Sequence, residues 1–304
     1  MRPITTYIQG NKMELVTIQN SSVKVEIQIL GGAFYTITDK RNGEQLVWEG
    51  EEGLWSARDH VMFPFVCRRV DGKYLDGGNE YDMPLHGFVR DMKFTVAKKR
   101  ENYVKLTVCS TPQTLKHYPH EFEISVIYSL DGDEISVDYE IVNIDGNDMY
   151  FSFGGHLGLK AITQSTERGE DTKGNYVTFN PPLDTIYNLS EGAFVLSPSV
   201  IKPIERLEVD KDFIRKYETL ILQTKQNSTL LYERGDGVKI KFTVPSPIIA
   251  LWTEENRGGF CCIEPWWGLP DSLPLNREIE KKPLMCKVNG NGIYKAGYKI
   301  EIIR

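Results

Sequence analysis

Several common classes of protein are excluded by what this sequence lacks. No apolar run approaches the ~20 residues that span a bilayer, and residues 1–14 lack the charged-then-apolar pattern of a secretory signal. The chain contains no P-loop and no GxGxxG motif, so nothing indicates a nucleotide cofactor. Its formal net charge is −6 and it has no long basic run, which argues against nucleic acid as a partner. We therefore expect a cytoplasmic protein that needs no cofactor.

Cysteine and histidine are also scarce, with five of each. Cys261 and Cys262 are neighbours, which rarely pair with each other, and no CxxC or Cys/His ligand spacing occurs. His117 and His120 are three positions apart, but Pro119 lies between them. We expect these two histidines at the surface, the thiols reduced and mostly buried, and no metal site.

Alternation of apolar and polar residues with period two dominates the chain and predicts β-strands. The clearest examples are 23–29, 122–130, 134–142, 238–244 and 294–302. Asp131-Gly132-Asp133 joins two of them as a hairpin turn. Amphipathic helices are few, and a short one is expected within Ile204–Tyr217. Many short strands separated by Gly, Asn and Asp turns predict an all-β protein, a large antiparallel β-sandwich.

No linker, internal repeat or low-complexity segment divides the chain. Thr163–Asn175 is polar and contains glycine, so we expect a surface loop that tolerates insertion. A chain of 304 residues fits one large sandwich domain as well as two smaller domains. We predict a single domain over residues 1–304.

The most informative stretch is Phe260–Asp271, in which an apolar run delivers Glu264 and two tryptophans follow Pro265. Proline cannot donate to a β-ladder, so we expect the strand to end at Glu264. A carboxylate beside the exposed indoles of Trp266 and Trp267 suits a sugar site, because the acid handles a hydroxyl proton and an aromatic face covers the apolar side of a pyranose. A core strand whose glutamate caps a turn is the plainer interpretation.

Two histidine segments favour the sugar site. His86 lies in Met83–Asp91 and His156 in Tyr150–Leu159, both apolar and both with glycine beside the histidine. Glycine lets the backbone approach a ligand closely or take a positive φ. A single histidine in such a segment is more often a core residue, but two of them together with Glu264 form a set.

These segments resemble the aldose 1-epimerase (galactose mutarotase) family, and in particular its LacX-like branch. Glu264 falls in a segment similar to the family's Cys-Ile-Glu-Pro-Trp, His86 in its Pro-Gln-His-Gly-Phe and His156 in its Gly-Gly-His-Pro-Ala-Phe. Arg68 ends a segment similar to Phe-Pro-hydrophobic-Val-Gly-Arg. The resemblance covers nearly the whole chain, including the opening segments 31–33, 46–50 and 54–55. It implies a large antiparallel β-sandwich with the sugar site on a concave sheet face.

The sequence departs from the family pattern at three places. Leu85 stands where glutamine is usual, Cys67 replaces a glycine, and Leu157-Gly158-Leu159 replaces Pro-Ala-Phe. The last change can reshape the wall beside His156, and the change at Cys67 can move Arg68. None of them removes a group that does chemistry, so they bear on the substrate rather than on the reaction class.

The resemblance implies exchange of the anomers of a free aldose, a small-molecule sugar substrate. The C1 hydroxyl is deprotonated, the ring oxygen is protonated, and the ring opens and recloses on the other face. Glu264 is then the base and His156 the acid, protonated at rest beside a carboxylate. His86 and Arg68 bind the substrate, and Trp266 stacks on the sugar. The family's further acidic contact has no motif here, and Asp212 is only a candidate for it.

Three other functions fit parts of the same pattern. A glycosidase needs two facing carboxylates, but Asp91 is expected to pair with an arginine. A non-catalytic carbohydrate-binding protein needs the tryptophans and Arg68 but not the pair of His156 and Glu264. A sugar-phosphate mutarotase needs clustered cations such as Arg68, Arg69 and Arg90; Arg69 is expected to face solvent and Arg90 to pair with Asp91. Neutral hexose is favoured, while the particular sugar and the oligomeric state are left open.

Overall fold

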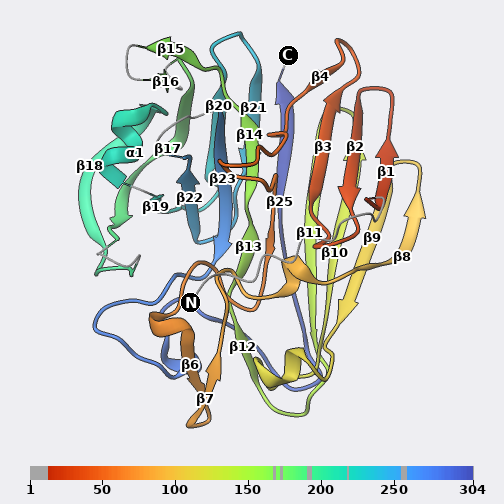
Figure 1. Cartoon of the computed structure of the whole chain (residues 1–304), viewed down its shortest axis with the longest axis vertical. Helices are drawn as coiled ribbons and strands as arrows, with labels where there is room; N and C mark the ends of the chain where they lie inside the picture. Colours follow the sequence, from red (N-terminus) through yellow and green to blue (C-terminus); the bar gives the residue numbers. More distant parts are fainter. Residues whose placement is uncertain are drawn as a thin grey trace.

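The computed structural model of the protein describes residues 13–303, except 167–168, 172–173, 190–193, 218 and 255–258. It is nearly all β, with one large antiparallel sheet, a four-stranded sheet packed against one part of it and three two-stranded ribbons (Figure 1). The predicted class, a large antiparallel β-sandwich, is confirmed.

The four-stranded sheet contains β1 (Leu15–Gln19), β2 (Val23–Gln28), β3 (Phe34–Asp39) and β4 (Glu44–Gln45), in that order. The main path of the large sheet runs β5 (Val61–Met62), β13 (Phe153–Gly155), β23 (Phe260–Trp267), β22 (Ile248–Trp252), β19 (Thr219–Gln223), β17 (Tyr176–Tyr187), β20 (Thr229–Glu233), β21 (Lys239–Thr243), β25 (Ile293–Ile303), β11 (Glu134–Asn143), β10 (Phe122–Asp131), β9 (Tyr103–Cys109) and β8 (Thr95–Arg100). β14 (Leu157–Lys160) pairs with β23, and β18 (Ser199–Glu208) pairs with β17.

The ribbons are β6 (Lys73–Asp76) with β7 (Asn79–Asp82), β12 (Met149–Phe151) with β24 (Cys286–Val288), and β15 (Gln164–Thr166) with β16 (Gly169–Asp171). The described helices are α1 (Lys211–Tyr217) and the 3-10 turns η1 (Val70–Gly72), η2 (Val89–Asp91), η3 (Thr114–Lys116) and η4 (Ile279–Lys281).

The five segments predicted from alternation are confirmed as strands. β10 and β11 pair over their whole lengths, and the pairing closes at Asp131 opposite Glu134, as the turn chemistry indicates. The helix within 204–217 is shorter than its candidate segment, because β18 extends to Glu208 and α1 begins only at Lys211. The expected loop Thr163–Asn175 contains the β15–β16 ribbon, and part of it lies outside the described residues.

The main core lies between the four-stranded sheet and the strands behind it. In Figure 1, β1 to β3 stand in front of β9 to β11, and the inward side chains of both layers belong to one cluster. Val25 and Ile27 are buried with Val126 and Val137, all of them at alternate positions of their strands. Half-buried strands are apolar on the core face and polar on the other, which is the pattern that the alternation indicated.

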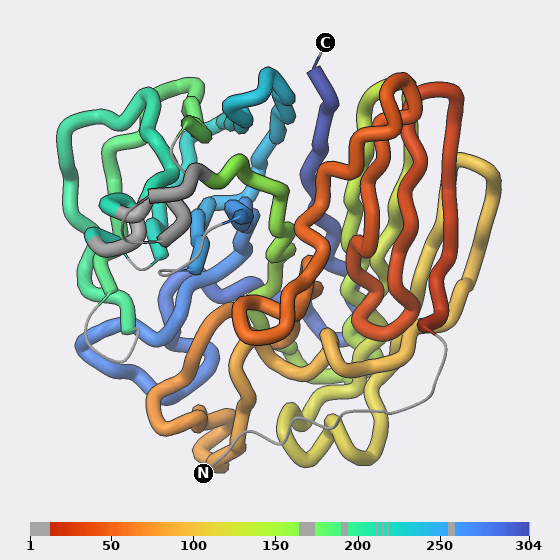
Figure 2. Tube along the Cα trace, turned by 45° about the horizontal axis from the view of Figure 1, so that its top comes forward, coloured from red at the N-terminus to blue at the C-terminus, as the bar shows by residue number. Residues whose placement is uncertain are grey.

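The other half of the large sheet carries β13, β14, β22 and β23, and the segment that follows β4 crosses it. Figure 2 shows this orange segment descending beside the green β13–β14 region. Val47 bridges to Leu159, and the Gly158 amide donates to the Arg58 carbonyl oxygen at 2.9 Å. Residues 46–60 are therefore pinned along β14, on the side where the histidine segment lies.

β23 is buried on both faces, so its tryptophans are not exposed. Trp267 is 5% exposed and stacks on Phe153 in the main core, with ring centroids 4.8 Å apart. Trp266 is 2% exposed and packs on the opposite face, in a smaller cluster that includes Ile248. The interpretation of these indoles as exposed is wrong, because this edge of the sheet is covered from both sides.

Within the described residues, no helix is long and apolar enough to cross a membrane.

Candidate active site

Pro265 interrupts the pairing of β23 without ending the strand. β23 pairs with β13 on one side of the proline and with β14 on the other, and the two pairings share one register. That register places His156, between β13 and β14, directly opposite Glu264. The His156 amide donates to Asp59 Oδ1 at 3.1 Å instead of to the ladder. The prediction that the strand ends at Glu264 is therefore wrong, and the lost donor frees the backbone of the facing histidine.

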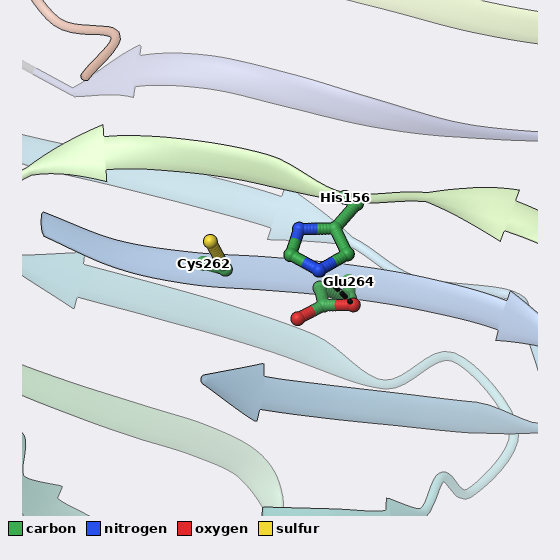
Figure 3. A group of neighbouring side chains, drawn as sticks. All are labelled: His156, Cys262 and Glu264. Carbon is green, nitrogen blue, oxygen red and sulfur yellow. Dashed lines mark ion pairs between the residues drawn. The ribbon is translucent and has the colours of Figure 1, made fainter. Parts of the chain in front are cut away.

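His156 and Glu264 face each other across this gap (Figure 3). His156 Nε2 lies 3.4 Å from Glu264 Oε2, and both residues are buried. Trp266 Nε1 donates to the same oxygen at 3.2 Å. His156 Nδ1 and Glu264 Oε1 are buried and have no hydrogen-bond partner among the described residues. Buried polar atoms are rarely left so, which marks this pair as the place where a ligand's polar groups fit.

Burial decides the protonation of this pair. It raises the pKa of Glu264 well above its usual value and lowers the pKa of His156 to about 4, because a charged group loses hydration in the interior. The expectation of a resting imidazolium at His156 is therefore not met. A neutral histidine beside a protonated glutamate carries the same number of protons as the ion pair, so the two states differ by one proton transfer.

His86 is held as a neutral hydrogen-bond donor. The Cys67 amide donates to His86 Nδ1 at 3.1 Å, which leaves the proton of the neutral ring on Nε2. Burial, followed by the neighbouring histidines, lowers its pKa well below 6.5. His86 has φ 63° and Gly87 φ 71°, and a Cβ at Gly87 would lie 2.0 Å from the Phe63 carbonyl oxygen. The glycine therefore sets the histidine's position, and the two ring centroids of His86 and His156 are 5.3 Å apart.

Asp59 and His60 also belong to the site, although no local pattern in the sequence points to them. Asp59 Oδ2 accepts from the Phe34 amide at 2.9 Å while Oδ1 holds His156, and burial raises the pKa of Asp59 to about 6. The His60 ring centroid lies 5.8 Å from that of His156 and 6.4 Å from that of His86. These two residues have no glycine-rich frame around them, and the available signal is only their place just before β5 (Val61–Met62) and the Phe-Pro-Phe segment that follows it.

The aromatic surface beside the pair is formed by Trp55 and Trp252, both partly exposed. Trp55 lies 5.1 Å from the His156 ring and Trp252 5.7 Å, measured between centroids. The two indoles meet edge to face at 5.6 Å. They offer the accessible faces that had been expected of the β23 tryptophans.

Gly158 explains how Trp55 reaches this position. A Cβ built on Gly158 would lie 2.5 Å from Cζ3 of Trp55, so the indole occupies the space that a side chain would fill. The departure from the family's Pro-Ala-Phe at this point therefore does reshape the wall beside His156.

Replacing Gly158 by Ala is expected to displace Trp55 and to raise the KM for a sugar more than it lowers kcat, because the His156–Glu264 pair stays in place. Steady-state kinetics would show the split. Gly146→Ala is the matched control, since a Cβ there meets no atom within 4 Å. An unchanged KM in Gly158→Ala would mean that the Trp55 surface does not contact the sugar.

The arginines do not form a cluster of free cations. Arg69 is buried, with Nη1 2.8 Å from Asp271 Oδ1, and Lys282 Nζ reaches the same oxygen at 2.5 Å. The expectation that Arg69 faces solvent is wrong, because Asp271 draws it into the interior. Arg68 is exposed and lines an open groove of about 1160 Å³. Arg90 lies 3.7 Å from Asp91, as expected.

His117 and His120 lie away from the His156–Glu264 pair, whereas Cys262 lies beside it. His117 is partly buried, and His120 is buried with Nε2 2.7 Å from Asp76 Oδ2, so the surface assignment of His120 is wrong. Its pairing with a carboxylate compensates for burial of the ring. Asp212 lies exposed in the first turn of α1. The described cysteines are free thiols, and three of the five are buried.

With this geometry in place, the chain can be compared with known proteins. It belongs to the aldose 1-epimerase family, whose sequence model matches residues 14–299. It falls in the LacX-like branch: it is 24% identical to protein LacX (chromosomal) of Lactococcus lactis, over 95% of this chain and 99% of that protein. The family is one of carbohydrate epimerases, so a sugar is the class of molecule on which it acts.

Solved structures show the same fold. A galactose mutarotase related enzyme from Lactobacillus acidophilus superimposes with a TM-score of 0.89 at 23% identity, covering 96% of this chain and 98% of that one. A galactose mutarotase-like protein from Lactobacillus casei gives a TM-score of 0.88 at 22% identity, covering 95% of this chain and 100% of that one. At these identities the likeness establishes the galactose mutarotase-like sandwich and not the substrate.

Proposed function

We propose that the protein is a mutarotase that interconverts the α and β anomers of a free hexose. The observation that carries the proposal is the buried pair of His156 and Glu264, each with an unpartnered polar atom. One acid and one base are what ring opening requires, and the pair holds one transferable proton between them. A single cytoplasmic domain without a cofactor stays our expectation for the chain.

The reaction follows from the groups of the pair. A sugar hydroxyl that donates to Glu264 stabilises its carboxylate, and the proton moves to His156 across the 3.4 Å contact. Glu264 then takes the proton of the C1 hydroxyl while His156 gives its proton to the ring oxygen. The bond between C1 and the ring oxygen breaks, the aldehyde turns about C1–C2, and the steps reverse on the other face.

The neighbours of the pair take supporting roles. His86 donates its Nε2 proton towards the ring oxygen, where negative charge develops as the bond breaks. Trp55 and Trp252 provide the surface for the apolar face of the sugar. Arg68 stays our proposed contact to the sugar hydroxyls, because it is exposed and its charge acts on His86.

Trp266, predicted from the sequence as a stacking surface, is better placed to act on Glu264. It is buried, and its indole donates to the carboxylate that must ionise. A hydrogen bond to a charged group contributes about 1.5–3 kcal/mol, so it favours the reactive form of the base.

Polarimetry tests the proposed function. Freshly dissolved α-glucose and α-galactose should reach their equilibrium rotations faster with the protein than without it, and the ratio of the two rates would begin to define specificity. If neither relaxes faster, phosphorylated and rarer aldoses are tested next. Failure with all of them would favour a non-catalytic carbohydrate-binding protein.

Replacing Trp266 by Phe is expected to lower kcat roughly 10–100-fold, because the lost hydrogen bond is worth about 1.5–3 kcal/mol to the ionised base. The KM should change little. Trp267→Phe is the matched control, since that indole lies on the opposite face of β23. A rise in KM at constant kcat in Trp266→Phe would mean that Trp266 stacks on the sugar and that its hydrogen bond to Glu264 does not affect the base.

A sugar phosphate is less well supported as the substrate. Of the three arginines considered for a phosphate site, Arg69 is neutralised by Asp271 in the interior, and Arg90 lies beside Asp91. Arg90 and Arg68 both lie near His86, since the charge of each lowers the pKa of that histidine, but two cations, one of them beside Asp91, make a weak phosphate site.

A further inference from the structure

Three metal-ligating side chains of different chemistry meet at the centre of the site. One ring nitrogen of His156, the sulfur of Cys262 and a carboxylate oxygen of Glu264 all lie within 4.8 Å of one another. Cys262 and Glu264 are two positions apart on β23, so their side chains share the face that His156 approaches (Figure 3). The mechanism proposed above uses the histidine and the glutamate but gives the thiol no role.

The unpartnered atoms at this place point to a ligand. His156 Nδ1 and Glu264 Oε1 are buried donor and acceptor positions without a partner among the described residues. A buried polar atom without a partner costs about 1–3 kcal/mol, so a group that satisfies both atoms binds with a gain. A sugar hydroxyl is one such group, and for the carboxylate a metal ion bound through Glu264 Oε1 is another.

We propose that His156, Cys262 and Glu264 form a binding site for a thiophilic divalent cation such as Zn²⁺, and that the ion and the sugar exclude each other. The exclusion rests on the proposed function, whereas the binding of the ion does not.

The donor set fits zinc in kind and in number. Sulfur, imidazole nitrogen and carboxylate oxygen are its usual protein ligands, and three of them leave the fourth tetrahedral position for water. Bonds of about 2.0–2.3 Å place tetrahedral ligand atoms roughly 3.3–3.7 Å apart. His156 Nε2 and Glu264 Oε2 already have this separation, at 3.4 Å, and the Cys262 sulfur lies within 4.8 Å of a ligand atom of each residue.

Charge balance also favours a divalent ion. A thiolate and a carboxylate bring two negative charges, the neutral imidazole brings none, and the complex with Zn²⁺ has no net charge. A neutral complex avoids the cost that a charge pays on burial. Zinc binds the deprotonated thiolate and carboxylate, so binding of the ion should weaken as the pH falls.

Occupation by the ion predicts inhibition rather than catalysis. The ion coordinates the base and the acid at the same time, so neither can exchange a proton with the sugar. The chain would therefore lose activity when zinc is present and recover it when a chelator is added.

Titration of the metal-free protein with Co²⁺, which replaces Zn²⁺ in tetrahedral sites, tests the binding directly. We expect a thiolate-to-cobalt charge-transfer band in the near ultraviolet, with one ion per chain, which Zn²⁺ abolishes. Cys262→Ser should lose this band and weaken Co²⁺ binding at least about tenfold. Cys261→Ser is the matched control, since its side chain points from β23 into the opposite core cluster, and it should keep the band.

The exclusion is measured separately with the sugar that polarimetry identifies. Zn²⁺ should inhibit wild type competitively, and Cys262→Ser should resist Zn²⁺ when its turnover is compared with its own rate in the absence of metal. A band that survives in Cys262→Ser, or no Co²⁺ binding at all, overturns the site. Stimulation by Zn²⁺, or inhibition that excess sugar does not relieve, overturns the exclusion. If Cys262→Ser does not fold, the existence of the site is tested with His156→Asn. Loss of the visible d–d bands of bound Co²⁺ in that variant would support the site, and their survival would overturn it.

The two proposals can fail independently. A Co²⁺ band that depends on Cys262, in a protein that accelerates no anomer exchange, would leave the metal site standing without the mutarotase. Anomer exchange without any thiolate-to-cobalt band would support the mutarotase and overturn the metal site.

Discussion

Replacing Glu264 by Gln is expected to remove most of the turnover, by roughly 10²–10⁴-fold, while sugar binding stays detectable. The amide is nearly isosteric with the carboxyl group and can still accept from Trp266, so the site keeps its shape. It cannot take the proton of the C1 hydroxyl, however. Both oxygens of Asp59, the nearest alternative, accept backbone amides.

Polarimetry measures the turnover of Glu264→Gln, and quenching of the fluorescence of Trp55 and Trp252 measures its affinity for the sugar. Glu280→Gln serves as the control, since Glu280 is exposed on η4. Comparable turnover in Glu264→Gln and wild type would remove Glu264 from the role of base.

Replacing His156 by Asn is the second large effect, with an expected loss in kcat of roughly 10²–10⁴-fold, the usual contribution of one general acid. The backbone should hold its place in this variant, because Asp59 is bonded to the main-chain amide of residue 156 and not to its ring. The loss would therefore report on proton transfer to the ring oxygen.

The split between kcat and KM decides the role of His156. A loss confined to KM would make the histidine a binding residue, and the acid would have to be sought at His86 or His60. His117→Asn is the control, because His117 hydrogen-bonds the Asp82 carbonyl oxygen outside the site and its replacement should leave both constants unchanged.

The strands and the members of the central pair could be predicted from the sequence, since both depend on local signals. Alternation reports which face of a strand is buried, and the frames around His86, His156 and Glu264 are short. Pro265 was interpreted correctly as a lost donor but wrongly as a strand end. A strand continues through proline when its other edge is paired, and β22 pairs with β23 up to Trp266.

What could not be predicted depends on contacts between distant segments. Asp59 acts through backbone amides of residues 34 and 156, and nothing local to its own sequence indicates this. Trp55 and Trp266 look equally available in the sequence. Trp266 is buried because β23 is packed on both faces, whereas Trp55 lies outside that strand and stays accessible. Arg69 likewise pairs with Asp271, 202 positions away.

Because of the two hydrogen bonds of Asp59, activity also depends on the docking of the two sheets during folding. One oxygen holds β3 of the four-stranded sheet, and the other holds the backbone of His156 in the large sheet. Glu264 comes from β23, which is synthesised after both segments that Asp59 holds. Closing such long loops is slow relative to forming a local hairpin. Catalytic competence should therefore be the last property to emerge during biosynthesis, and its appearance would report that the two sheets have docked.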